Sequence, residues 1–323
     1  MTTPQHETGP GEVDRLAAIG WRLLLDHATV AVVRSLGTAG VDAILLKGPV
    51  IARWLYDAPD DRRYVDIDLL VAASDLDATR RVLAGQAFVL VSAALPASGG
   101  PHAETWFRER DHVAVDLHRC LHGLEHLEGD AGFDLVWRDH ERLDLGGDAP
   151  LAVPGVAVRT LHAVLHLQPK DDPGSRAWVD LERAVSRVDL ATWRAAAELA
   201  AEVGVREEVG PLLRLVDGGA ALADELGLPS VPSAQLLRHH RRHAPRLDRL
   251  VRRIRGGSPA EVRRAIRMTL APPPSRVRLS YPIARRGGLG LAAAYLWRIA
   301  RFPWLVLESV RHRRRGGSTP RLR

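Results

Sequence analysis

The chain has 323 residues, 46% of them hydrophobic, which suggests two domains and excludes a globally disordered protein. Cys120 is the only cysteine, so a disulfide framework is excluded and we expect a protein of the reducing cytoplasm. The sequence contains no uninterrupted run of 18 or more apolar residues, and its first residues do not resemble a signal peptide. We therefore expect no membrane-spanning helix.

The formal net charge of +6 is carried almost entirely by arginine. Lys47 and Lys170 are the only lysines among 45 Lys and Arg residues. Each is either present by chance or needed as a compact ammonium group, which suits a phosphate. Arginine-rich runs at residues 238–255 and 311–323 are most often solvated surface, although they also suit nucleic acid or an anionic membrane.

The first predicted elements are a helix, a strand and a second helix. Residues 13–36 predict an amphipathic helix, and residues 43–46 predict a short buried strand. The strand ends at Lys47-Gly48-Pro49, where the proline suits the first turn of a helix over residues 50–56. Residues 57–61 contain a proline and predict a loop.

Residues 64–71 alternate in polarity and predict a strand with one acidic and one apolar face. Asp66 and Asp68 share the acidic face with Tyr64 and Leu70. The apolar face consists of Val65, Ile67, Leu69 and Val71. We expect the apolar face to lie in the core and the acidic face to line a cleft.

Two further strands and a helix are predicted before residue 150. Ser74 is expected to cap the helix, and residues 88–92 form the first of the strands. Residues 112–118 alternate again, which places Asp116 and His118 together on one face of the second strand.

The second half of the chain reads as helical. Helices are predicted over residues 159–168, 175–188, 190–203, 205–226 and most of 235–270. We therefore expect an α+β protein in which a small mixed β-sheet domain with flanking helices, residues 1–153, precedes an all-helical domain, residues 154–272. Residues 273–323 would hold an amphipathic helix and a basic tail. Either this helix docks on the body, or residues 285–323 make a peripheral membrane contact.

The paired aspartates favour a metal site. Carboxylates at positions i and i+2 of a strand point the same way, with Cβ atoms roughly 6–7 Å apart. Two such groups repel each other, and a divalent cation between them removes the penalty. Asp116 on a similar strand supplies a third carboxylate, and three carboxylates can hold two metal ions. The alternative is an edge strand whose acidic face is simply solvated.

These residues resemble the uncharacterised nucleotidyltransferase family of the DNA polymerase β-type superfamily. The resemblance covers roughly residues 40–185 and is strongest in Leu45-Leu46-Lys47-Gly48-Pro49, Arg62, Asp66-Ile67-Asp68-Leu69-Leu70-Val71 and Val115-Asp116-Leu117-His118. A weaker likeness continues in Leu161-His162-Ala163-Val164-Leu165-His166 and Trp178-Val179-Asp180-Leu181. Pro49 and Val65 depart from the family pattern, which usually has smaller or hydrogen-bonding residues there.

The resemblance implies a role for each matching residue. Asp66 and Asp68 would bind magnesium, with manganese as the alternative metal, and Asp116 would complete the site or act as a base. Gly48 would mark the phosphate-side turn.

Other roles are predicted from side-chain chemistry. Lys47 would bind the substrate phosphates. Arg62 would either clamp a phosphate or pair with Asp66 or Asp68, although Arg63 could take its place. His118 would orient Asp116, move a proton or simply pack.

Two more histidines and a lysine are weighed in the helical half. His162 and His166 are one helical turn apart, and we interpret them mainly as packing residues. His166 and Lys170 would lie beside the cleft, where Lys170 would contact the nucleotide.

The expected function is transfer of a nucleoside monophosphate from a nucleoside triphosphate to an acceptor hydroxyl or phosphate, with release of pyrophosphate. The acceptor would be a small molecule, a peptide or a protein. One alternative is a degenerate protein that binds nucleotide or regulates without turnover. Another, less favoured, is an RNA-directed nucleotidyltransferase that uses the basic run at residues 238–255.

Overall fold

The computed structural model describes residues 10–92, 103–147, 149–167, 175–230 and 281–300, together with residues 274 and 277. The chain divides into two compact units, residues 1–233 and residues 234–323. Several expected features lie outside the described residues: Lys170, the helical stretch 235–270, the basic run 238–255 and the tail from residue 301.

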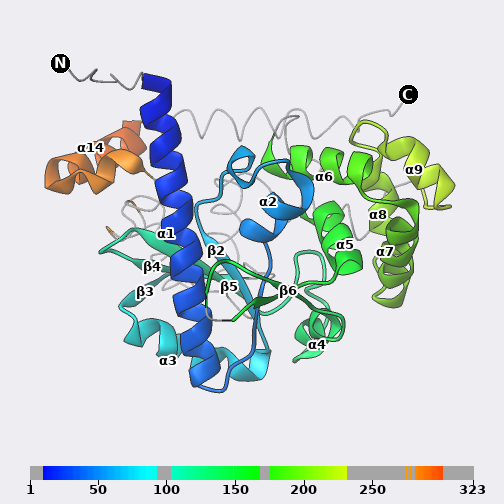
Figure 1. The fold of residues 1–323 in the computed structure, drawn as a ribbon, viewed down its shortest axis with the longest axis horizontal. Helices are drawn as coiled ribbons and strands as arrows, with labels where there is room; N and C mark the ends of the chain where they lie inside the picture. Colours follow the sequence, from blue (N-terminus) through cyan, green and yellow to red (C-terminus); the bar gives the residue numbers. More distant parts are fainter. Residues whose placement is uncertain are drawn as a thin grey trace, which may run out of the picture. The chain divides into compact units, whose positions relative to one another are not determined.

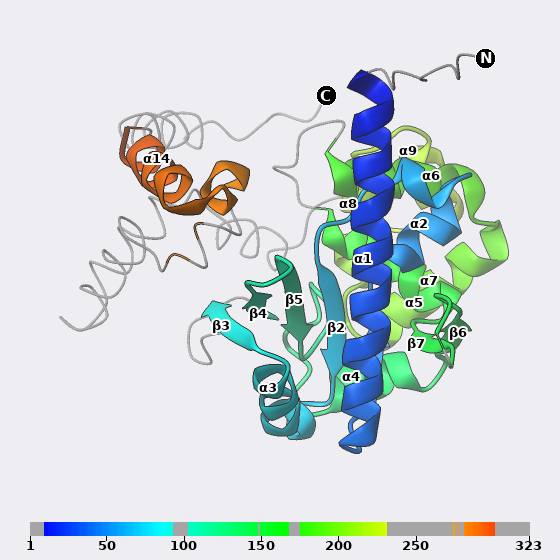
Figure 2. The same cartoon turned by 60° about the vertical axis from the view of Figure 1, so that its left-hand side comes forward.

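The first unit is built around a seven-stranded mixed sheet with the strand order β3-β4-β5-β2-β1-β7-β6 (Figures 1 and 2). Its strands are β1 Ala43–Leu45, β2 Ile67–Val71, β3 Phe88–Ser92, β4 Ala103–Arg108, β5 Val113–His118, β6 Glu141–Leu143 and β7 Leu151–Val153. The β1–β7 and β2–β5 pairs are parallel, and the other pairs are antiparallel. The predicted α+β class with a mixed sheet is confirmed.

Helices cover the sheet and extend beyond it. In chain order they are α1 Pro10–Thr38, α2 Pro49–Leu55, α3 Leu76–Gly85, α4 Ala131–Trp137, α5 Val156–His166, α6 Arg176–Arg187, α7 Leu190–Glu202, α8 Arg206–Leu213 and α9 Gly219–Glu225. Helices α5 to α9 gather on one side of the first unit (Figure 1). The prediction of one helix over residues 205–226 is wrong, because Gly218 has a φ of 74° and separates α8 from α9.

The core between α1 and the sheet fixes the direction of the β2 side chains. Ile67, Leu69 and Val71 join Leu25, Val32 and Leu36 of α1 in one buried cluster. The predicted apolar face is therefore right for these three residues and wrong for Val65, which is 51% exposed. Tyr64 is buried instead, and its hydroxyl donates to Asp26 Oδ1 on α1. This anchor to α1 precedes the strand, which begins only at Ile67.

Two smaller predictions are also corrected. Ser74 does not cap α3, because its hydroxyl donates to Asp130 Oδ2 at 2.8 Å, and Asp75 is the residue that precedes the helix. His112 is not part of β5; it lies in the preceding turn with a φ of 61°.

Helix α1 contains a stretch, Arg15–Thr38, that is long and apolar enough to cross a membrane by length and composition. A packing helix of a globular domain passes the same test, and one face of this stretch lies in the sheet core. Asp26 in its middle bonds to Tyr64 and pairs with Arg22. Packing on the sheet thus accounts for the buried face of this helix, whereas Leu16, Leu23 and Leu24 are exposed.

The expected boundary between residues 153 and 154 lies inside the first compact unit. Strand β7 pairs with β1 in the sheet, and only Pro154 and Gly155 separate the end of β7 from the start of α5. Helix α6 in turn contacts α2. The helical half is therefore joined to the sheet by both covalent and packing contacts.

The second unit contains α14, Gly287–Ala300. Ala294 is buried with Val277 and Ala284, whereas Leu289 and Trp297 are exposed. The membrane contact predicted for residues 285–323 remains a prediction.

Candidate functional site

Three carboxylates come together where β2 and β5 run side by side. Asp68 lies on β2 and Asp116 on β5, and the parallel register of the two strands pairs these residues directly. Asp66 immediately precedes β2. Residues paired in register point to the same face of a sheet. The pairing of β2 with β5 therefore brings Asp68 and Asp116 together although they are 48 residues apart in the sequence.

Asp68 is the buried centre of this cluster. Its Oδ1 atom lies 2.9 Å from Lys47 Nζ and 2.9 Å from His118 Nε2. Burial alone would raise the pKa of Asp68, but Lys47 and His118 hold that pKa well below its usual range. His118 therefore contacts Asp68 directly, whereas the sequence pattern had suggested Asp116 as its partner.

The other two carboxylates are held at raised pKa values. Burial, and then the charges of Asp68 and Asp116, raise the pKa of Asp66 to about 7. Burial and the charge of Asp68 also raise the pKa of Asp116, although a hydrogen bond with Thr105 opposes the shift. The cluster therefore holds more negative charge than its own cations neutralise.

The donor set has the chemistry that magnesium or manganese prefers, since carboxylate oxygens are hard ligands and mutual repulsion favours a bound cation. Among the described residues, however, no three His, Cys, Asp or Glu side chains are arranged to hold a metal ion. Asp68 points at Lys47 in this conformation. The donor atoms thus suit a divalent cation by type, while Lys47 Nζ lies at the carboxylate that such an ion would need.

The turn between β1 and α2 places Lys47. Gly48 has a φ of 64° and a ψ of −113°, a conformation that residues with a side chain rarely adopt. A Cβ atom there would lie 3.4 Å from Tyr64 Cδ2. Pro49 begins α2, as predicted, so this turn sends the chain from the sheet into a helix with Lys47 at the carboxylates.

Helix α5 brings histidines to the same place. Lys47 Nζ lies 3.3 Å from His166 Nε2. His162 stacks edge-on against His166, with ring centroids 5.8 Å apart. Burial, and then the charge of Lys47, holds the pKa of His162 well below its usual range. His162 therefore packs as a neutral ring, as interpreted, and His166 is a direct neighbour of Lys47.

Arg62 contacts neither Asp66 nor Asp68 by any hydrogen bond or ion pair described for it. Its Nε donates to Asp180 Oδ1 at 2.8 Å and its Nη2 donates to Asp180 Oδ2 at 2.7 Å. Tyr56 also donates to Asp180 Oδ1, and burial and this hydrogen bond raise the pKa of Tyr56 to about 12. The predicted pairing of Arg62 with Asp66 or Asp68 is thus replaced by a buried pair between the loop after α2 and helix α6. The phosphate clamp predicted as the other alternative remains a prediction.

Sequence reasoning missed two neighbours of the cluster, Thr105 and Arg176, and one contact of His166. Thr105 pairs in register with Asp116, but β4 was not recognised as a strand. Arg176 at the start of α6 is exposed and lies close enough to Asp66 to oppose the rise of its pKa. His166 was placed beside the cleft, but its contact with Lys47 was not foreseen, because the two residues are 119 positions apart.

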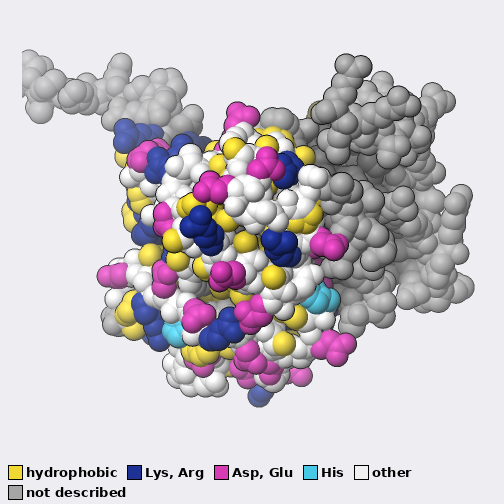
Figure 3. All heavy atoms as spheres, turned by 90° about the vertical axis from the view of Figure 1, so that its right-hand side faces the viewer, with side chains coloured by type: hydrophobic (Ala, Val, Ile, Leu, Met, Phe, Trp, Pro, Cys, Tyr) yellow, Lys and Arg dark blue, Asp and Glu magenta, His cyan; other side chains and the backbone are white. Residues whose placement is uncertain are grey.

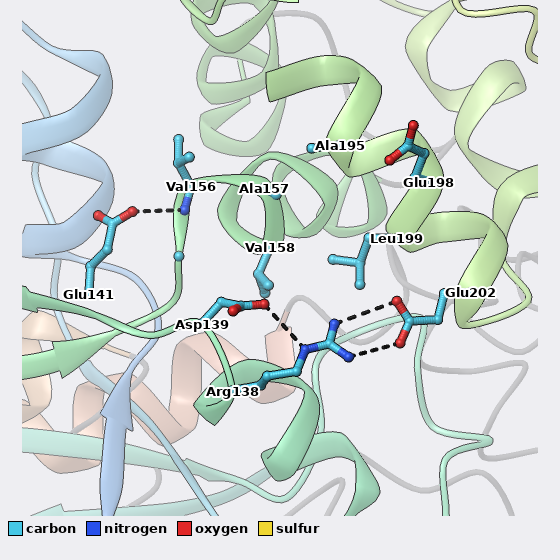
Figure 4. Close-up of a pocket in the computed structure, with 11 residues that line it drawn as sticks. Arg138, Asp139, Glu141, Val156, Ala157, Val158, Ala195, Glu198, Leu199 and Glu202 are labelled. Carbon is cyan, nitrogen blue, oxygen red and sulfur yellow. Dashed lines mark hydrogen bonds and ion pairs between the residues drawn. The ribbon is translucent and has the colours of Figure 1, made fainter. Parts of the chain in front are cut away.

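A cavity of about 420 Å³ lies elsewhere, between the α4–β6 turn, the start of α5 and helix α7. Figure 4 shows acidic side chains around it, with Arg138 between Asp139 and Glu202. None of the three clustered aspartates lines this cavity. We therefore place the candidate site at the carboxylates and not at this cavity.

The surface over the helical side bears on the nucleic-acid alternative. Figure 3 shows acidic and basic side chains interspersed on the described part of this face. Proteins that bind nucleic acid by charge gather basic side chains in a patch or stripe. The visible part of this face carries no such stripe.

Three solved structures share a low likeness with the chain, and TM-scores below 0.5 carry no functional argument. The antibiotic-resistance factor ANT(2'')-Ia is 12% identical over 55% of this chain and 95% of its own, with a TM-score of 0.38. An antigenic nucleotidyltransferase-like protein from Paracoccidioides brasiliensis is 14% identical over 59% and 93%, with a TM-score of 0.35. JHP933 from Helicobacter pylori is 11% identical over 75% and 97%, with a TM-score of 0.31.

No curated protein matches the chain by sequence. The profile of the uncharacterised nucleotidyltransferases matches residues 15–218, which is more than half of the chain and includes every carboxylate of the cluster. The chain therefore belongs to the uncharacterised nucleotidyltransferase family.

Proposed function

We propose that the protein transfers a nucleoside monophosphate from a nucleoside triphosphate to an acceptor hydroxyl or phosphate in a metal-dependent reaction. The observation that carries this proposal is the meeting of Asp66, Asp68 and Asp116 where β2 and β5 pair, with Lys47 beside Asp68. Burial and neighbouring charge raise the pKa of Asp66 and of Asp116, and groups with such shifted pKa values gather at functional sites.

The proposed reaction exchanges one bond to phosphorus for another. The acceptor oxygen bonds to the α-phosphorus, the bond to the β-phosphate oxygen breaks, and pyrophosphate leaves. Asp66, Asp68 and Asp116 would hold magnesium or manganese, which supplies charge stabilisation for the phosphates.

The remaining work falls to the chain's own side chains. Asp116, whose pKa is raised, would accept the proton of the acceptor. His118 orients Asp68 through its contact with Oδ1. Gly48 and Pro49 set the turn that places the Lys47 ammonium for the substrate phosphates.

The test is a turnover assay with labelled triphosphates, magnesium and a lysate as the source of acceptor, followed by mass spectrometry of the labelled species. Asp66→Asn and Asp68→Asn should each abolish labelling, while circular dichroism shows an intact fold. Full labelling by either variant would refute the proposal.

A second candidate is a protein that binds nucleotide without turnover. It is favoured by one observation: the described residues hold no three groups arranged for a metal ion. Isothermal titration with Mg-ATP, Mg-GTP and Mg-CTP distinguishes the two. Binding without any turnover supports the second candidate, and the absence of all binding counts against both.

A further inference from the structure

Lys47 lies where a divalent cation would be expected. Its Nζ is 2.9 Å from Asp68 Oδ1, and His118 Nε2 is 2.9 Å from the same oxygen. A carboxylate oxygen has about two lone pairs, so two such neighbours use its capacity. The side chains of Lys47 and Asp68 are only 17% and 8% exposed, so water screens their attraction weakly.

Lys47 also has a second polar neighbour that does not belong to the carboxylate cluster. His166 Nε2 lies 3.3 Å from the ammonium nitrogen. Lys47 follows β1 and His166 closes α5, which follows β7, and these strands are parallel neighbours. The ammonium therefore has a polar neighbour from a different element if it leaves Asp68.

We propose that Lys47 occupies the cation position at Asp68 in the free protein and moves to the nucleotide phosphates when the loaded site forms. This inference rests on the proposed function. It adds that Lys47 and a divalent cation compete for Asp68. A bound nucleotide attracts the Lys47 ammonium away from Asp68 and thereby increases the affinity of the carboxylates for the metal ion. Free metal alone would bind weakly.

The first test measures Mn²⁺ affinity without nucleotide, from the loss of the free-ion electron paramagnetic resonance signal. Lys47→Met removes the charge with little change in length, and should bind Mn²⁺ at least about tenfold more tightly than the wild type, because a cation beside the ligand is gone. Lys47→Arg keeps the charge and should show no such gain.

Arg53→Met is the matched control. It removes a positive charge from α2, where Arg53 lies 3.6 Å from Asp26 and not at the carboxylate cluster. We expect its Mn²⁺ affinity to stay within about twofold of the wild type, since charges beyond a contact are screened. ATP affinity should fall for Lys47→Met and not for Arg53→Met.

The wild-type protein supplies a second test that depends on no variant's folding. The chain has only two lysines, so lysine labelled with ¹³C at Cε gives two resonances, which Lys170→Arg assigns. We expect the Lys47 resonance to shift when Mg²⁺ and ATP are added together and to change little with Mg²⁺ alone. An unchanged Lys47 resonance at saturating Mg-ATP overturns the inference.

The remaining outcomes separate the inference from the function on which it rests. If Mn²⁺ binds the wild type, Asp66→Asn abolishes that binding, and Lys47→Met binds Mn²⁺ no more tightly, the exchange is wrong while the metal site stands. If no variant binds Mn²⁺ with or without nucleotide, the proposed metal-dependent function itself fails.

Discussion

Arg62 and Asp180 are 118 positions apart in the sequence and form a buried two-point ion pair, with 2.8 Å between Nε and Oδ1 and 2.7 Å between Nη2 and Oδ2. The pair joins the loop after α2 to helix α6. Arg62 Nη1 also lies 3.4 Å from the carbonyl oxygen of Gly48, so the pair reaches the turn that carries Lys47. Arg62, predicted either to clamp a phosphate or to pair with Asp66 or Asp68, thus joins helix α6 to the turn beside the carboxylates.

Removing one partner of this pair should be costly. Arg62→Ala leaves the Asp180 carboxylate buried without its main cation, and we expect the free energy of unfolding to fall by about 3–5 kcal/mol in urea titrations. The double variant Arg62→Met with Asp180→Leu removes both charges and should be less destabilised than Arg62→Ala.

The exposed pair between Arg187 and Asp57 is the control for this prediction. It also joins α6 to the loop after α2, at 2.9 Å, but Asp57 is 77% exposed. Arg187→Ala should cost about 1 kcal/mol or less. Equal losses for Arg62→Ala and Arg187→Ala would show that burial of the Arg62 pair does not matter.

Asp66 predicts a pH dependence of stability in metal-free protein. Its pKa is about 7 in the folded state and about 4 when unfolded, so the folded state binds more protons between these values. Asp66 alone therefore lowers the free energy of unfolding as pH rises from about 4 to about 7, by at least about 1 kcal/mol, whereas the depressed pKa of His162 acts in the opposite direction below about pH 6.5. Asp116, whose pKa is also raised, acts in the same direction.

Urea titrations in EDTA at pH 5 and pH 8 measure this effect. Asp66→Asn should lack the fall due to Asp66, and the difference between the wild type and the variant isolates that group, because His162 titrates in both. Asp68 does not confound the comparison: its folded pKa is depressed, so its contribution is lost only as pH falls below its unfolded value near 4. A profile of the same slope in Asp66→Asn would contradict the assignment.

Gly48→Ala tests the turn between β1 and α2. The φ of 64° and ψ of −113° strain any residue with a Cβ, so we expect a loss of about 1–3 kcal/mol in stability and weaker ATP binding. Gly37→Ala is the control, since Gly37 lies in α1 with nothing within 4 Å of an added Cβ. Gly37→Ala should be neutral or stabilising by up to about 1 kcal/mol.

Asp116→Asn tests the third carboxylate. As the proposed proton acceptor and metal ligand it should lower kcat at least about 100-fold, while KM for the nucleotide changes less. Rates at several pH values check this, because loss of a base also removes its limb of the pH profile. An unchanged kcat would remove Asp116 from the reaction.

Local patterns in the sequence predicted the elements that carry the site. The alternation of residues 67–71 and 113–118 gave both strands, and the Gly-Pro pair predicted the start of α2. The alternation predicted the wrong orientation for Tyr64 and Val65. Tyr64 is buried, and its hydroxyl donates to Asp26, which lies 38 residues earlier in the sequence. Periodicity within one strand does not contain such a contact.

Side-chain partners were less predictable than strands. Arg62 lies four residues before Asp66, and spacing suggested a shared role, yet its partner Asp180 is on a helix in the other half of the chain. The pattern of β5 suggested that His118 contacts Asp116 on the same strand, whereas the pairing of β5 with β2 brings His118 to Asp68. Both errors arise because charged side chains pair with the oppositely charged groups closest in space, which can be far away in the sequence.

The strand order bears on where the chain can be truncated. Strand β1 lies between β2 and β7, and β7 leads directly into α5 through Pro154 and Gly155. Gly155 lies close to the preceding turn, because an added Cβ atom would be 2.2 Å from the Asp139 carbonyl oxygen. A fragment that stopped at residue 153 would keep all three aspartates and lose His166 and Asp180. Because α5 packs against α6, α7 and α8, we expect a stable fragment to include these helices as well.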